Sequence, residues 1–182
     1  MLYNNIEAER NAALTVAELM LAAARTAPKG CGADNLAAVI IDGEEKARLA
    51  DQMRKIAAET GEDFFARDAG NVDASAVVVL LGAINKPLGL THCSYCGFED
   101  CVAMYKAGAN CAFNVTDLGI AVGSAVSVAA DHRVDNRVMF SAGKAAIALN
   151  YLSDNVRVAY GIPLSASSKS IYFDRSPENV ML

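Results

Sequence analysis

The sequence predicts a single domain that mixes helices and strands, of the α/β or α+β class. Helix-like and strand-like segments are interspersed along the 182 residues, with no repeat, low-complexity tract or clear linker. Hydrophobic residues make up 53% of the chain, which is enough for a sizeable core, and there is no Trp. We therefore expect residues 1–182 to form one domain whose core is built mainly from Ala, Val, Leu and Ile.

The first predicted element is a long helix over residues 6–25, ended by Pro28 and Gly30. Such a helix is expected to be buried on most sides, either in the core or against a second subunit. Its polar residues form one narrow stripe at steps of three or four: Glu7, Asn11, Thr15, Glu18 and Arg25.

Later elements follow from apolar runs and their boundaries. Residues 36–41 predict a short strand, and the β-branched run at 76–81 predicts a strand buried on both faces. Between them, Asp42 is placed at the N-cap of a helix, and Glu45, three residues later, completes a capping-box pattern. Gly61 is expected to end this helix. Three more elements are expected: helices over 116–132 and 143–151, and a strand over 156–160 followed by loop from 161.

Charge and the N-terminus limit the class of protein. The net charge of −5 argues against nucleic acid as a partner, because phosphate binding needs a basic face. The N-terminus lacks the basic start and apolar stretch of a signal peptide, which favours a cytoplasmic protein with reduced thiols. The conspicuous uncharged helical stretch, 118–130, holds 13 residues, whereas a membrane span needs about 20, so no membrane association is expected.

Four of the five cysteines lie within 19 residues, in the pattern Cys93-x2-Cys96-x4-Cys101-x9-Cys111. Two thiolates separated by two residues can face one metal on a tight turn, and two more complete a sulphur shell. Gly97 allows the backbone to fold over the sulphurs, where N–H groups could donate to them. The pattern predicts one metal or iron–sulphur site.

The spacing of the four cysteines bears on which metal they would bind. Structural zinc commonly uses two C-x2-C pairs, and only one is present, which leans toward an iron–sulphur cluster. Zinc, four unrelated buried cysteines and a disulfide are the alternatives. His92 precedes the first cysteine and is expected at the surface or behind the ligands, while Cys31 is expected to be a small buried residue or a free thiol.

The residues also resemble a family of domain-of-unknown-function proteins that are described as containing a ferredoxin domain. The resemblance covers most of the chain and rests on four blocks: residues 24–30, the Cys-Gly segment, residues 117–125, and residues 161–165 with 173–175. It implies a cysteine-ligated cluster.

A second resemblance is to flavin nitroreductases. It rests on Ala-Arg-Thr-Ala-Pro at 24–28, on Asp34-Asn35 before an apolar strand, and on a small-residue helix followed later by Gly-x-Pro. It implies a nitroreductase-like α+β sandwich, with the cysteine-rich segment at about 85–113 as an insertion, and a homodimer around FMN. The implied flavin contacts are Arg25, Lys29 and Asn35, with phosphate contacts from Lys169 and Arg175.

Two further patterns have structural and functional interpretations. Gly119, Gly123 and Ser127 recur every four residues, which favours tight helix packing, for instance at a dimer axis. His132 lies in a charged cluster that either caps a helix or holds a catalytic histidine. The leading hypothesis is a redox protein that exchanges electrons with a flavin or a partner protein. The rival is a non-catalytic protein with structural zinc and no flavin.

Overall fold

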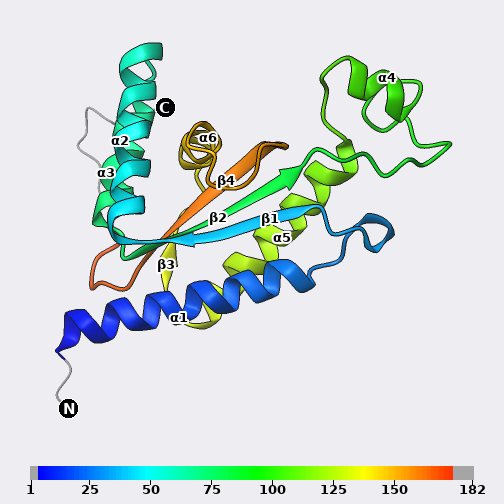
Figure 1. Ribbon diagram of the computed structural model, residues 1–182. Helices are drawn as coiled ribbons and strands as arrows, with labels where there is room; N and C mark the ends of the chain where they lie inside the picture. Colours follow the sequence, from blue (N-terminus) through cyan, green and yellow to red (C-terminus); the bar gives the residue numbers. More distant parts are fainter. Residues whose placement is uncertain (1–3, 174–182) are drawn as a thin grey trace.

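The computed structural model describes residues 4–173 of the chain. A four-stranded antiparallel sheet in the order β1-β2-β4-β3 forms its centre, with helices on both faces (Figure 1). In chain order the elements are α1 (Asn5–Thr26), the 3₁₀ turn η1 (Gly30–Gly32), β1 (Leu36–Ile41), α2 (Gly43–Thr60), α3 (Phe64–Ala74), β2 (Val77–Ile84), α4 (Cys101–Lys106), α5 (Ala112–Asp131), β3 (Asp135–Asn136), α6 (Phe140–Ala148) and β4 (Val156–Ser165).

Strand β2 lies between β1 and β4 and is buried on both faces, as its sequence predicts. Side chains alternate along a strand, so successive residues enter different cores. Val77, Val79 and Leu81 pack with α1 and α5, whereas Val78 and Leu80 pack with α2, α3 and α6. The molecule is therefore a three-layer sandwich with the sheet in the middle (Figure 1).

Helix α1 and strand β1 agree with the predicted segments, and Gly61 ends α2 in a left-handed conformation with φ +74°. The predicted cap on α2 is wrong. The Asp42 side chain makes no capping hydrogen bond, because its Oδ2 instead accepts from Arg10 Nη2 on α1 at 2.6 Å. The guanidinium of Arg10 therefore binds the carboxylate that was expected to cap α2.

Other differences concern boundaries and short elements. Helix α3 and the short helix α4 were not predicted. Strand β4 continues through residues 161–165, where a loop was expected, because those residues pair with β2 and β3. Helix α5 begins at Ala112, four residues before the predicted start, and α6 begins at Phe140.

Within the described residues, α5 is the one helix long and apolar enough to cross a membrane by length and composition, with a mean hydropathy of 1.4 over its best window. Core helices of other proteins satisfy the same test. Here one side of α5 packs on α1 and the sheet through Leu118, Ala121 and Ala125. Only 28% of its most apolar stretch is buried, so residues 4–173 leave the opposite side of α5 uncovered.

Candidate functional site: the cysteine lobe and the end of strand β1

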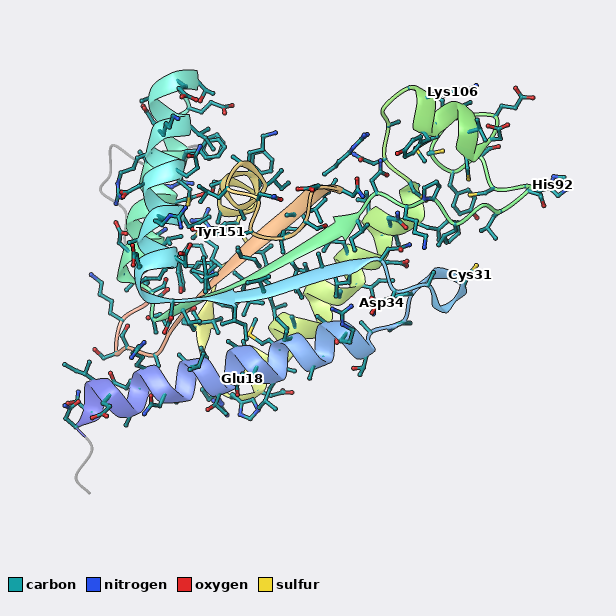
Figure 2. All side chains as sticks on the ribbon, viewed as in Figure 1. Glu18, Cys31, Asp34, His92, Lys106 and Tyr151 are labelled. Carbon is teal, nitrogen blue, oxygen red and sulfur yellow. The ribbon has the colours of Figure 1, made fainter. Side chains whose placement is uncertain are left out.

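The segment between β2 and α5, residues 85–111, extends beyond the sheet as a separate lobe that contains α4 (Figure 1). We call it the cysteine lobe, because it holds Cys93, Cys96, Cys101 and Cys111. The first three thiols are half-buried, the fourth is buried, and all four are free. Figure 2 shows His92 at the outer tip of this lobe, directed away from the sheet.

Tight turns set the positions of the first two cysteines. Ser94 and Gly97 both adopt left-handed backbone conformations, with φ of +49° and +82°. The Gly97 N–H donates to the Ser94 carbonyl at 2.9 Å, which closes a turn around Cys96. A left-handed position favours glycine, so Gly97 fits the predicted role of folding the backbone between the ligand candidates.

The other two cysteines stand at helix starts. Cys101 is the first residue of α4, whose start is fixed by Asp100 accepting the Ala103 N–H at 2.7 Å. Cys111 is the N-cap residue of the 20-residue helix α5 and makes no side-chain cap hydrogen bond. The N-terminus of a long helix favours negative charge, which suits a thiolate ligand at this position.

The donor set matches a metal or cluster, but its atoms are not gathered at one point. Four free thiols in one lobe are the ligands that zinc or an iron–sulphur cluster uses. Among residues 4–173, no three His, Cys, Asp or Glu side chains converge closely enough to hold a metal ion. The lobe therefore has the right chemistry, and its loops would have to close to complete a site.

Cys31 lies outside this lobe, on the turn between α1 and β1. It is exposed, with φ +56°, and its thiol is free. Figure 2 shows its side chain at the outer end of that turn. Of the two expectations for Cys31, the free thiol is confirmed and the buried position is wrong.

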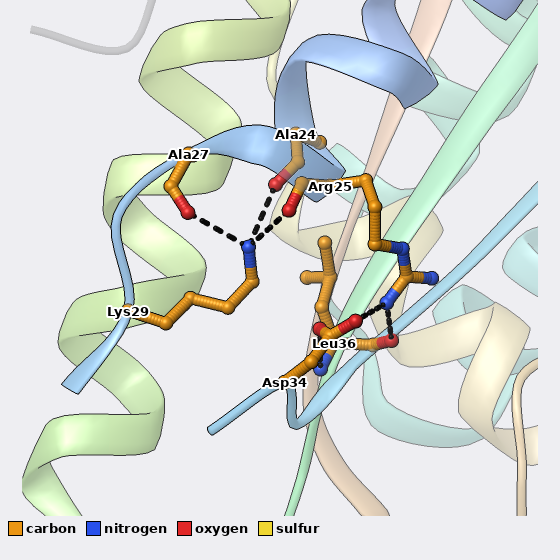
Figure 3. A network of polar contacts seen from close by, with 6 residues as sticks. All are labelled: Ala24, Arg25, Ala27, Lys29, Asp34 and Leu36. Carbon is orange, nitrogen blue, oxygen red and sulfur yellow. Dashed lines mark hydrogen bonds and ion pairs between the residues drawn. The ribbon is translucent and has the colours of Figure 1, made fainter. Parts of the chain in front are cut away.

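The structure brings two of the predicted flavin contacts, Arg25 and Lys29, together near the start of β1 (Figure 3). Arg25 forms an ion pair with Asp34 and donates to the Leu36 carbonyl at 3.0 Å. Lys29 Nζ donates to three carbonyls at the end of α1, those of Ala24, Arg25 and Ala27, at 3.2, 2.6 and 2.8 Å. Both cations are thus engaged by this chain's own oxygens.

These cations also act on Asp34. Partial burial alone would raise the pKa of this carboxyl. The hydrogen bond from Arg25, the Leu36 N–H and the charges of Arg25 and Lys29 outweigh that effect and hold the pKa of Asp34 below its ordinary value. Asp34 is consequently an anion that ties the end of α1 to the start of β1.

Asn35 belongs to a buried amide network that the sequence did not reveal. Its Nδ2 donates to the Asn114 Oδ1 at 3.3 Å and to the Lys86 carbonyl at 3.2 Å. Asn114, on the first turn of α5, is only 3% exposed and donates to the carbonyls of Ile84 and Lys86 at 2.9 and 2.8 Å. A lone Asn inside a helix gives no sequence signal for such a role.

The cavity beside this network is small. Its volume is about 10 Å³, and its lining includes Lys29, Asn35, Asn114 and Asp117. That volume corresponds to about one water molecule. A flavin ring does not fit in it, so the residues present do not hold FMN in this arrangement.

The predicted phosphate contact Lys169 lies away from this group. Leu36 pairs with Ala83 near the end of β2, whereas Leu164 pairs with Val77 at its start, so Lys169, just past β4, lies toward the opposite end of the sheet. Arg175 lies outside the described residues. Within one chain, Lys169 is therefore not brought together with Arg25, Lys29 and Asn35.

Two other polar residues, His132 and Asp68, make contacts that connect or end helices. His132 is exposed at the C-cap of α5, and its backbone N–H caps the helix through the Val128 carbonyl at 3.1 Å. Asp68 on α3 is 5% exposed and accepts from Ser141 Oγ at 2.6 Å and from Arg67 Nη2 at 2.9 Å. This buried carboxylate joins α3 to α6, and no periodic pattern in the sequence predicts it.

The comparisons with known proteins identify the family. A family described as "Uncharacterized protein containing a ferredoxin domain" matches residues 107–175. An uncharacterized protein of Archaeoglobus fulgidus is 41% identical over 186 residues, covering 98% of this chain and 100% of its own. This chain belongs to that family of ferredoxin-domain proteins. The matched segment contains Cys111 but not Cys93, Cys96 or Cys101.

Similarity to solved structures shows the fold class of this chain. A nitroreductase family protein from Clostridium novyi NT aligns with a TM-score of 0.53 at 14% identity, covering 92% of this chain and 76% of that chain. An FMN-dependent nitroreductase from Clostridium difficile aligns with a TM-score of 0.53 at 14% identity, covering 86% and 77%. An oxidoreductase containing FMN gives a TM-score of 0.57 at 14% identity, covering 85% and 67%. The fold of this ferredoxin-domain protein is nitroreductase-like, as predicted.

Proposed function

We propose that this protein is a cytoplasmic redox protein in which Cys93, Cys96, Cys101 and Cys111 hold an iron–sulphur cluster. The observation that carries the proposal is the concentration of four free thiols in one lobe that projects from a nitroreductase-like sandwich. Membership of a family described by a ferredoxin domain supports it. When bound, such a cluster supplies reversible one-electron transfer.

The chain's own residues serve this role in distinct ways. Asp100 fixes the start of α4 and so the position of Cys101, and the N-terminus of α5 provides a favourable setting for a Cys111 thiolate. The turn closed by Gly97 leaves Cys96 half-buried, where its thiol can move toward the others without unfolding a helix or strand. An electron-transfer protein is the kind of partner that this site would serve.

The rival proposal is a structural zinc site without catalysis. Zinc would use the same thiols, and it would hold the cysteine lobe closed without electron transfer. Iron content and colour separate the two proposals, because a zinc protein is colourless.

The cysteine assignment is tested by paired variants. Cys96→Ser, purified anaerobically as the full chain, is expected to lose most of its bound iron, since one of four ligands is gone. Cys31→Ser is the matched control, because Cys31 is a free thiol on another segment, and it is expected to keep the wild-type iron content. Equal loss of iron in both variants would refute the grouping.

FMN is a separate part of the proposal. It is supported by the FMN-containing proteins that share the fold, by the proximity of Arg25 and Lys29, and by the cavity that Lys29 and Asn35 both line. Because the polar groups of those residues already have partners and the cavity holds about one water, flavin binding would require this site to open, and we assign no step to it. A yellow chromophore released by denaturation would support FMN, and a colourless supernatant would contradict it.

The proposed assembly is a homodimer that pairs the uncovered sides of α5. That side carries no charge from Val115 to Ala130, and it includes the exposed residues Val115, Thr116, Gly119, Ile120, Gly123 and Ser127. A Cβ added at Gly119 or Gly123 would meet no atom of the described residues within 4 Å, so packing within that part of the chain does not require glycine there. Close approach of a second helix from the partner subunit would require small residues at these two positions.

A further inference from the structure

A hollow in the cysteine lobe lies directly against Cys93. Its volume is about 340 Å³, and it is lined by Leu90, Thr91, His92, Cys93, Tyr95 and Phe113. This volume is at the lower end of the range for small-molecule sites, which suits a molecule of one or two rings. The hollow is distinct from the 10 Å³ cavity at Asn35.

An aromatic pair forms one wall of the hollow. The rings of Tyr95 and Phe113 are stacked, with centroids 5.4 Å apart and planes 14° apart. Tyr95 is nevertheless 76% exposed, so one ring face rests on Phe113 and the rest of the ring meets solvent. The lower ring is fixed in turn, because Phe113 is in the first turn of α5 and packs beside Gly30.

The lining also limits the charge of an occupant. Among the residues that the structure describes, no Lys, Arg, Asp or Glu lines the hollow, although the whole chain carries 37 such residues, 16 basic and 21 acidic. An ionic ligand would lose hydration there without gaining an opposite charge. A flat uncharged ring would cover the open faces of Leu90 and Tyr95, with the Thr91 hydroxyl and His92 available for a polar substituent.

We propose that this hollow is a binding site for a planar, uncharged ring molecule of the quinone class, stacked on Tyr95 and lying against Cys93. The binding itself rests on the stacked pair, the volume and the absence of charge. A redox role for the bound ring, next to one ligand of the cluster, rests on the proposed function.

Equilibrium dialysis of the full-length protein against duroquinone tests the site. Duroquinone is neutral and planar, and its ring is fully substituted, so it does not alkylate thiols. Saturable one-to-one binding is expected. Tyr95→Ala should weaken it by about tenfold, which is the upper range for one stacking contact, whereas Tyr95→Phe should preserve it. The control is Tyr105→Ala, because Tyr105 is 58% exposed on α4 but does not line the hollow.

Binding that is absent, or equal in Tyr95→Ala and wild type, would overturn the proposal. Because Tyr95 is exposed, its replacement is not expected to unfold the chain, and an unchanged circular dichroism spectrum checks this. Iron measured on the same samples separates the two claims. Iron without duroquinone binding contradicts the site alone, and duroquinone binding without iron supports the site while contradicting the cluster.

Discussion

Asp117 on α5 accepts the backbone N–H of Gly30 with both carboxylate oxygens, each 3.0 Å from the nitrogen. The two residues are 87 positions apart in sequence. The contact joins the turn after α1, which carries Cys31, to helix α5, whose N-cap residue is Cys111. It therefore connects the start of β1 to the base of the cysteine lobe.

Asp117→Ala removes the acceptor for the Gly30 N–H and is expected to lower the free energy of unfolding by about 2 kcal/mol, a typical value for a hydrogen bond to a charged group. Urea denaturation followed by circular dichroism measures it. Asp131→Ala, at the exposed far end of α5, is the control and should change stability by less than about 0.5 kcal/mol. Equal effects would show that the Gly30 contact contributes nothing.

Gly143→Ala is expected to destabilise the protein severely, by about 3 kcal/mol or more. Its Cβ would lie 2.0 Å from the Ala159 carbonyl oxygen, where α6 meets the backbone of β4. Gly70→Ala provides the matched change in α3, where a Cβ meets nothing within 4 Å. It should stabilise the chain by about 0.5–1 kcal/mol. Thermal unfolding of both variants distinguishes close packing from a general effect of glycine replacement.

Tyr151 should ionise late in an alkaline titration. Burial, with help from Glu45, raises the pKa of Tyr151 to about 12. Its hydroxyl donates to the Glu45 carbonyl at 3.2 Å. The neutral form is favoured in the folded state, so this stabilisation is complete below pH 10 and is lost as pH rises toward 12. The difference in phenolate absorbance between wild type and Tyr151→Phe should appear near pH 12; a midpoint near 10 would contradict this environment.

Ile120→Glu should convert the proposed dimer to monomer. Ile120 is 41% exposed at the centre of the uncharged side of α5, and burying a new carboxylate there would be costly. Light scattering after size exclusion measures the mass. Val138→Glu, at a site 39% exposed outside α5, should leave the dimer intact. A monomeric wild type would contradict the assembly.

Much of the fold follows from local patterns. β2 was predictable because a β-branched run is apolar on both faces, and α2 ended where Gly61 permits a left-handed turn. Long-range contacts were not predictable. The Asp42 side chain accepts from Arg10 and therefore does not cap α2. Leu164 pairs with β2 and β3, although a Ser-rich loop follows it.

The same limit applies to the sites. Four cysteines that are close in sequence were expected to lie in one part of the fold, and they share one lobe. Their binding of one metal or cluster stays a prediction. Spacing could not reveal that Asn114 completes the environment of Asn35, or that Phe113 stacks on Tyr95, because each pair forms only when α5 contacts another segment of the folded chain.

The most direct test is an absorbance spectrum of anaerobically purified protein, with iron, acid-labile sulphide and zinc measured on the same sample. The proposed function predicts a brown protein with a broad band near about 400 nm, and iron and sulphide in stoichiometric amounts. A colourless protein with stoichiometric zinc would contradict it.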